Sequence, residues 1–248
     1  EALPLPVSAL LAAAVCVVAG VAPASEVFRP FSQPLVFLFI GSFILAEAIR
    51  IHRLDRRLAF AVLALPMVGE RPIRIMLAVA VVSGVVSAFI SNTATTAMMV
   101  AIVAGMLSAV EQAGKQANCC PKPEFATGLF LCVAFAASIG GLATPIGTPP
   151  NVIGLAFIRE QLGVHISFFE WCLVGTPVSI CLILLSTLLL AMSFPAGVRH
   201  IEGMSQLVTN ERTQLGAWTT AQRSTALAFG VTVCLWVTPG LLTLTIGS

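Results

Sequence analysis

Two polar motifs lie inside long apolar segments, and their residue types suit the binding of small ions. The first is Ser91-Asn92-Thr93, and the second runs from Gly140 to Asn151. Hydroxyl, amide and carbonyl oxygens are ligands of hard cations. Hydroxyls and the free N–H groups at a helix start bind carboxylate or sulfate oxygens. Such groups together can hold a cation and an anion side by side, which is the chemistry of a symporter.

Both motifs interrupt apolar runs that are too long for one membrane crossing. The runs are Ile75–Val110, with 36 residues, and Phe125–Ile158, with 34, and neither contains a charged residue. A continuous helix of the first length measures about 54 Å, whereas the hydrocarbon core is roughly 30 Å thick. We therefore expect a helix break at each motif, which is where many transporters place their binding sites.

Each break supplies the groups that an ion site needs. A break at 91–93 leaves carbonyls unpaired at the end of one helix and N–H groups unpaired at the start of the next. In hydrocarbon each unsatisfied group costs several kcal/mol, so protein, water or a ligand must satisfy it. The second break offers Thr148 and five supporting residues that give close backbone approach, helix ends and side-chain oxygens: Gly140, Gly141, Thr144, Pro149 and Asn151.

The composition indicates an all-α, polytopic membrane protein. Apolar residues make up 58% of the 248 and charged residues only 10%, with a mean hydropathy of +0.99. Soluble domains carry about 25% charged residues. The net charge of +2 is too small to suggest nucleic acid. The cysteines lack metal-type spacing and no catalytic set lies near the breaks, so we expect neither an enzyme nor a cofactor.

The chain divides by composition into five predicted regions. We expect two spans followed by a cytoplasmic amphipathic helix, a transport region with a re-entrant hairpin and a broken helix, a further span, a cytoplasmic connector, and the start of a second repeat. In order these are 1–72, 73–158 (hairpin 73–112, broken helix 125–158), 159–196, 197–223 and 224–248. Leu3–Val21 also has features of a signal peptide, but it lacks a basic region before it. Near the end of the second span, Glu47 lies one turn before Arg50, so a snorkelling or paired carboxylate is expected and not a proton relay.

Charge asymmetry predicts that both ends of 73–112 lie in the cytoplasm. With that arrangement eleven of the thirteen Lys and Arg share one side: Arg50, Arg53, Arg56, Arg57, Arg71, Arg74, Lys115, Lys122, Arg199, Arg212 and Arg223. Only Arg29 and Arg159 face the other way. Two full spans joined at 91–93 give the same parity as a hairpin. We favour the hairpin because the triplet lacks the charge, Gly or Pro usual in surface turns.

These motifs are similar to those of one transporter family. Ser91-Asn92-Thr93-Ala94-Thr95-Thr96-Ala97-Met98-Met99 resembles the Ser-Asn-Thr signature of the divalent anion:sodium symporters, and Ser138-Ile139-Gly140-Gly141 with the stretch 144–151 resembles its partner motif. Similar stretches occur at 37–46, 54–59 and 168–171, so the resemblance covers most of the chain. It implies sodium-coupled symport of di- or tricarboxylates or sulfate, in the bacterial inner membrane, by an elevator movement of a homodimer with inverted repeats.

The resemblance also implies roles for particular residues. Ser87, Ser91, Asn92 and Gly147 would form a sodium site, and Ser91, Asn92, Thr93 and Thr148 would face the anion. The family carries a second Ser-Asn-Thr hairpin, which nothing after Gly197 supplies. We therefore expect this chain to hold one repeat, the N-terminal half, and not to transport by itself.

Two alternatives remain open from the sequence. One is a related transporter that is coupled to protons or carries another oxyanion. The other is a non-transporting membrane protein whose Ser, Thr and Gly residues serve only helix packing. Packing is the favoured interpretation for isolated serines such as Ser179.

Overall fold

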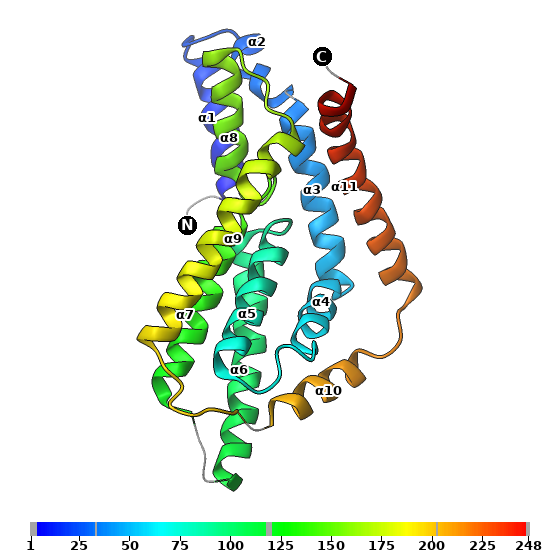
Figure 1. Cartoon of the computed structure of the whole chain (residues 1–248). Helices are drawn as coiled ribbons and strands as arrows, with labels where there is room; N and C mark the ends of the chain where they lie inside the picture. Colours follow the sequence, from blue (N-terminus) through cyan, green and yellow to red (C-terminus); the bar gives the residue numbers. More distant parts are fainter. Residues whose placement is uncertain (1–3, 33, 118–120, 202, 247–248) are drawn as a thin grey trace. The chain divides into compact units, whose positions relative to one another are not determined.

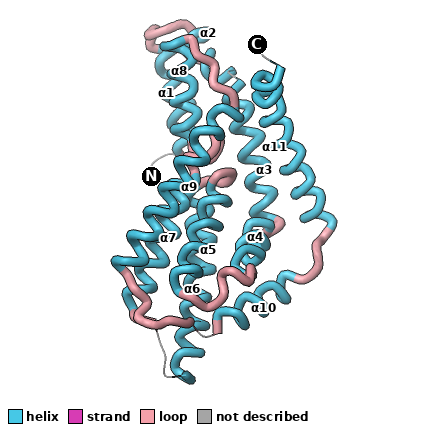
Figure 2. The backbone as a smooth tube through the Cα atoms, in the orientation of Figure 1, coloured by secondary structure: helices cyan, strands magenta, loops and turns pink. Residues whose placement is uncertain are grey.

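The computed structural model describes residues 4–32, 34–117, 121–201 and 203–246, and the regular structure in these ranges is helical (Figures 1 and 2). The elements are α1 (Leu5–Val18), α2 (Ala24–Val27), the 3-10 helix η1 (Arg29–Ser32), α3 (Pro34–Ile51), α4 (Leu54–Leu63), α5 (Pro72–Ser87), α6 (Asn92–Ala117), α7 (Pro123–Gly140), α8 (Pro149–Leu162), α9 (Phe168–Ser193), α10 (Met204–Leu215) and α11 (Thr220–Ile246). Small parts of the predicted segments lie outside the described residues, namely 1–3, 33, 118–120, 202 and 247–248.

Residues 1–42 and 43–248 form two compact units. In the first, α1 carries proline in its first turn, and the chain leaves it through Gly20 at a positive φ of 71°. The 14 residues of α1 measure about 21 Å. The rings of Phe28 and Phe31 lie 5.7 Å apart in the short helical turns that follow. The boundary between the units falls within α3.

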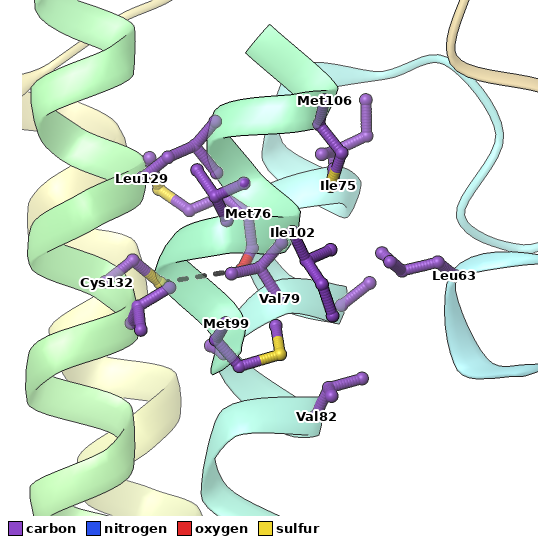
Figure 3. Close-up of a cluster of buried hydrophobic side chains, with 14 of the residues drawn as sticks. Leu63, Ile75, Met76, Val79, Val82, Met99, Ile102, Met106, Leu129 and Cys132 are labelled. Atoms are coloured by element: carbon purple, nitrogen blue, oxygen red, sulfur yellow. Dashed lines mark hydrogen bonds between the residues drawn. The ribbon is translucent and has the colours of Figure 1, made fainter. Parts of the chain in front are cut away.

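The core of the second unit is formed by α5, α6 and α7, with α9 packed on α5 and α7. Figure 3 shows side chains from α4, α5, α6 and α7 meeting in one apolar cluster. Core side chains that are at most 2% exposed include Ile75, Met76, Val79, Met99, Met106, Leu129 and Val133. Within a bilayer such contacts are stabilised mainly by close packing, because lipid is as apolar as the core.

Glycine allows three of these helices to approach closely. A Cβ atom on Gly140 of α7 would overlap the backbone of Gly84 on α5, and a Cβ atom on Gly84 would lie 2.5 Å from Ile183 Cδ1 on α9. Small residues at crossings are typical of helices that pack within membranes. This crossing fixes the ends of α5 and α7 next to each other, where both helices stop.

Each long apolar run forms two helices. The first is divided at residues 88–91 and the second at residues 141–148. Asn92 and Thr93 already belong to the first turn of α6, so the turn lies slightly earlier than the triplet on which we placed it. In Figure 1 the start of α5 and the end of α6 lie at the same, lower end of the second unit.

Three helical stretches in the described ranges are long and apolar enough to cross a membrane. They are Asn92–Gln112, Pro123–Gly140 and Phe168–Ser193, and Pro6–Val18 and Pro72–Ser87 are shorter apolar helices. With 16 residues, α5 measures about 24 Å, which is less than the roughly 30 Å of hydrocarbon. These lengths indicate a polytopic membrane protein.

Polar and charged contacts join α4 to α10. Arg56 pairs with Glu211 at 2.7 Å, and Arg57 donates to the carbonyls of Leu215 and Gly216 at 2.8 and 3.0 Å. A guanidinium group at a helix C-terminus satisfies carbonyls that the helix leaves unpaired. The segment predicted as a connector therefore contains a docked helix. The predicted pair of Glu47 and Arg50 is confirmed, with N···O distances of 2.8 and 2.5 Å.

The apolar side of α4 faces protein. Ala59, Phe60 and Leu63 are buried at 0%, 2% and 4% exposure, and the helix packs against α5 and α10. α5 and α10 therefore cover this side of α4. Leu58 and Met67, at 42% and 79% exposure, remain on the outside.

Candidate functional site

Ser91 ends the turn between α5 and α6 and caps the second helix. Its Oγ accepts a hydrogen bond from Ala94 N at 3.3 Å, and its carbonyl accepts from Thr95 N at 3.0 Å. Serine is a preferred N-cap because its hydroxyl can satisfy a free N–H of the first turn. Within the described residues, the N–H groups of Asn92 and Thr93 have no hydrogen-bond acceptor. Two donors at the positive end of α6 therefore remain available.

Asn92 links the two helices of this first pair. Ser87 Oγ donates to Asn92 Oδ1 at 2.7 Å. Ser87 is fully buried, whereas Asn92 is half-buried. This hydrogen bond fixes the carboxamide at the turn.

Asn92 also contacts the second break through Gly141. A Cβ atom on Gly141 would lie 2.5 Å from Asn92 Oδ1 and 3.2 Å from Nδ2. Any larger residue at position 141 would therefore displace the carboxamide. The backbone at Gly141 is ordinary helical, with φ −60°, so the close approach and not the conformation requires glycine.

Thr144 forms a second link between the breaks. Its buried hydroxyl donates to the carbonyl of Ala88 in the α5–α6 turn and accepts from Gly147 N at 3.1 Å. A hydroxyl can donate once and accept twice, so one side chain serves both segments. The break after α7 is thus tied directly to the break after α5.

Asn151 closes the segment 141–148 on itself. Its Nδ2 donates to Gly141 O at 2.8 Å and to Thr144 O at 2.9 Å. A Cβ atom on Gly147 would lie 2.5 Å from Gly141 O, so the chain returns tightly on itself. Residues 143–147 are all buried. The result is a compact loop that contacts Asn92 at Gly141.

Three side chains of α9 donate to carbonyls at the end of α7. Trp171 Nε1 bonds Leu142 O at 3.0 Å, Thr176 Oγ1 bonds Ala143 O at 3.3 Å, and Ser179 Oγ bonds Ile139 O at 3.0 Å. The donors from Trp171 and Thr176 satisfy carbonyls that a broken helix leaves free, whereas Ile139 O also accepts from Leu142 N. The sequence predicts packing for Ser179 and no site role for Trp171 or Thr176. Trp171, Gly175 and Ser179 recur every four residues on one side of α9, where a Cβ on Gly175 would lie 2.7 Å from Leu142 O, and this spacing was the available signal.

Thr95 is a further buried polar residue, which the sequence analysis named only as part of the motif and gave no role of its own. It is 1% exposed, and its Oγ1 has no hydrogen-bond partner among the described residues. An unpaired buried hydroxyl is uncommon in folded proteins. It adds one more oxygen to the first turn of α6.

The predicted site residues are only partly brought together. Direct contacts join Ser87, Asn92, Gly141, Thr144 and Asn151, and Gly147 and Gly140 lie against Gly141 and Gly84. Three others are more open: Ser91 and Thr93 are exposed, and Thr148 is half-buried. In the described residues the side chains of Thr93 and Thr148 make no hydrogen bond. Pro149 opens α8 at its first turn.

The local electrostatics come from backbone and neutral side chains. No charged residue occurs in 75–110 or 125–158. Helix N-termini attract anions and C-termini attract cations, and each break joins one of each kind. At α8, Pro149 and Pro150 carry no N–H, so the free donors come mainly from α6. The described residues contain no cluster of His, Cys, Asp and Glu that could hold a metal ion.

The chain is similar to bacterial membrane transporters. It is 31% identical over 243 residues to a sodium-dependent dicarboxylate transporter of Staphylococcus saprophyticus, covering 96% of this chain and 46% of the relative. It is 30% identical over 240 residues to the corresponding transporter of Staphylococcus aureus, with the same coverage of each chain. The chain thus spans about half the length of the curated relatives it matches.

The family comparison covers nearly every residue. The model of the sodium:sulfate symporter transmembrane region matches residues 1–247. Together with the membrane-length helices, this identifies an integral membrane protein, and its relatives indicate the bacterial plasma membrane. The chain belongs to the family of the sodium:sulfate symporter transmembrane region.

Proposed function

We propose that the protein transports small divalent anions, either di- and tricarboxylates or sulfate, together with sodium. The observation that carries this proposal is the junction of two helix breaks through Asn92, Gly141 and Thr144. It gathers carbonyl, amide and hydroxyl oxygens in a part of the chain without formal charge. The relatives are sodium-dependent dicarboxylate transporters by name, and the family is that of sodium:sulfate symporters.

Sodium is proposed to bind between Ser87, Ser91, Asn92 and Gly147. Ser87 and Asn92 share a hydrogen bond, and Gly147 contacts Gly141, which contacts Asn92. Sodium is a hard cation, and neutral oxygen ligands match it without requiring a carboxylate in the membrane. The ion here is a transported substrate.

The anion is proposed to bind beside sodium, at Ser91, Asn92, Thr93 and Thr148. The free N–H groups of Asn92 and Thr93 lie at the positive end of α6, where carboxylate or sulfate oxygens are favoured. The side chains of Thr93 and Thr148 add hydroxyl donors. Bound sodium would neutralise part of the anion's charge, which gives a physical reason for coupled binding.

The membrane arrangement is part of the same proposal. We place α5 and α6 in a re-entrant hairpin and α7 and α8 in a discontinuous helix of one repeat. The short length of α5 and the common end at which α5 starts and α6 ends support the hairpin. Elevator movement of a homodimer with a second, inverted repeat follows from the family resemblance. On this proposal the transporting unit is larger than this chain.

Ion replacement tests the proposal. Uptake of labelled succinate and sulfate by the full-length transporter is measured in proteoliposomes with external sodium or with choline in its place. We expect uptake of at least one anion with sodium and its loss with choline. Uptake that is equal in choline, or that follows an imposed proton gradient, would contradict sodium coupling.

A further inference from the structure

A cavity of about 620 Å³ lies where α5 and α7 begin and α9 ends, at the end of these helices opposite the candidate site. Its lining has two chemically different parts. Arg71, Arg199 and His200 are cationic or weakly basic. The others are mainly apolar and include Met76, Phe125, Ala191 and Phe194.

The basic side chains of the cavity are available to a ligand. Arg71 and Arg199 are exposed, and in the described part of the chain neither side chain makes a hydrogen bond or an ion pair. No Asp or Glu contributes to the lining. The side chain of Lys122 adds a third cation nearby, because its carbons lie 2.9 Å from where a Cβ on Gly197 would be. The charged side chains that line the cavity are therefore all positive.

Two helix starts add to this positive charge. Arg71 is the N-cap of α5 and Lys122 is the N-cap of α7, and each is followed by proline in the first turn. The N-terminus of a helix carries about half a positive elementary charge. The N-termini of α5 and α7 and the side chains of Arg71 and Arg199 all favour an anion at the opening of this cavity.

The floor of the cavity suits an acyl chain better than a free ion. Behind the basic rim the cavity is bounded by the apolar side chains of Met76 and Phe125, which are packed into the core at 1% and 2% exposure. Met76 also belongs to the packed core shown in Figure 3, which makes this floor rigid. Ile73, which also lines the cavity, is 52% exposed, which provides an apolar route to lipid. A small inorganic anion would gain nothing from this surface.

We propose that this cavity binds an anionic phospholipid, with its phosphate between Arg71 and Arg199 and an acyl chain over Met76, Phe125 and Phe194. Basic pockets between membrane helices on the cytoplasmic side bind anionic headgroups by this combination of charge and apolar contact. The site is separate from the proposed transport site and does not rest on the transport function. Its location is the side to which the arginine distribution assigns the cytoplasm.

Lipid binding to the purified full-length protein tests the proposal. Bound phosphatidylglycerol and phosphatidylcholine are counted by native mass spectrometry after titration from mixed micelles. The double variant Arg71→Gln/Arg199→Gln is compared with Arg212→Gln/Arg223→Gln, which removes two exposed arginines outside this cavity. We expect the affinity for phosphatidylglycerol to fall on the order of thirtyfold in the first, since each basic side chain contributes roughly 1 kcal/mol, and to be unchanged in the second. Equal retention of phosphatidylglycerol by both double variants would overturn the proposal.

A second arm separates lipid from a free anion. Inorganic phosphate is added as a competitor, and Ala191→Leu is used to fill part of the apolar lining. We expect phosphate to compete only weakly and Ala191→Leu to reduce lipid binding while both arginines remain. Full displacement by phosphate, or lipid binding that Ala191→Leu leaves unchanged, would show that the cavity is not a phospholipid site.

Discussion

Asn92 is the side chain that connects the two helix breaks. It accepts from Ser87 and occupies the space that Gly141 leaves open. Its carboxamide therefore contacts both the α5–α6 turn and the loop after α7. On the proposed function, the same oxygen also coordinates sodium, so its loss affects both structure and ion binding.

Replacing Asn92 with alanine tests this role. In Asn92→Ala the buried Ser87 hydroxyl loses its partner, which costs about 1–3 kcal/mol, and the sodium ligand is removed. We expect a lower melting temperature of the full-length protein and no further stabilisation by sodium chloride over choline chloride. The matched control is Asn210→Ala, because Asn210 is exposed on α10. A sodium-dependent shift in Asn92→Ala as large as in the wild type would favour packing as the residue's only role.

At this scale the sequence predicted residue types better than contacts. The length of the apolar runs located both breaks, because a bilayer limits how far a helix can continue. The meeting of Asn92 with Gly141 depends on how α5 crosses α7, which no local pattern specifies. This crossing is possible because neither Gly84 nor Gly140 has a side chain, so the backbones of α5 and α7 can touch there. For the same reason Thr95 and Trp171 received no role.

The helix α9 holds the end of α7 by three side-chain donors. The carbonyls of Leu142 and Ala143 accept no backbone hydrogen bond among the described residues, whereas the Ile139 carbonyl also accepts from Leu142 N at 3.0 Å. Each donor thus positions the loop that contacts Asn92. These residues are positioning residues, because no ligand contact is assigned to them.

Removing one donor at a time tests the role of α9. Ser179→Ala removes the side-chain donor to the Ile139 carbonyl, which still accepts from Leu142 N. We expect a loss of about 0.5–1.5 kcal/mol together with weaker sodium binding. Ser186→Ala is the matched control, since Ser186 Oγ bonds only within α9, to Ile183 O at 3.1 Å. The measurement is the sodium concentration that gives half of the maximal thermal shift. An equal value in both variants would contradict a positioning role for Ser179.

The helix α4 contains a carboxyl group whose burial makes stability depend on pH. Asp55 is 9% exposed, and burial raises the pKa of its carboxyl, against the opposing effects of the Arg56 N–H and the charges of Arg50 and Arg56. The folded-state pKa then exceeds the unfolded value of about 3.9. The folded state binds the proton more tightly, so stability falls as pH rises from the unfolded pKa through the folded pKa.

Substitution of Asp55 should remove this pH dependence. In Asp55→Asn the amide oxygen can still accept from Arg56 N, but no charge forms on raising the pH. We expect a flatter melting temperature between about pH 4 and 7 and a higher value at neutral pH than in the wild type. Glu124→Gln, at an exposed position of α7, is the control. A pH profile of Asp55→Asn that coincides with the wild-type profile would contradict the assignment.

At the scale of the whole molecule, composition and charge predicted the class of protein and the positions of its helices, whereas they did not predict single side-chain contacts. Membrane-length helices and the breaks follow from the hydropathy of the chain. The docked helix α10 did not, because its contacts with α4 come from Arg56, Arg57 and Glu211, which lie far apart in the sequence. In the sequence, residues 197–223, which include α10, had the pattern of a polar connector.

The predicted sidedness can be measured by labelling single cysteines. In a cysteine-free background, Arg74→Cys and Gln112→Cys mark the two ends of the α5–α6 pair, and Gln161→Cys marks the end of α8. These positions are exposed. We expect a membrane-impermeant thiol reagent added outside cells to label Gln161→Cys, and to label the other two only after permeabilisation. Labelling of Arg74→Cys and Gln112→Cys from opposite sides would contradict the proposed hairpin.

The central claim is that sodium-coupled transport depends on the contact between the two helix breaks. Its most direct test is sodium-gradient-driven uptake of labelled succinate and sulfate by the full-length transporter, comparing Gly141→Ala with Gly154→Ala. The added Cβ at 141 would lie 2.5 Å from Asn92 Oδ1, whereas at 154 nothing lies within 4 Å. We predict that uptake is lost in Gly141→Ala and kept in Gly154→Ala, with both proteins folded. Sodium-driven uptake by Gly141→Ala at the wild-type rate would contradict the claim.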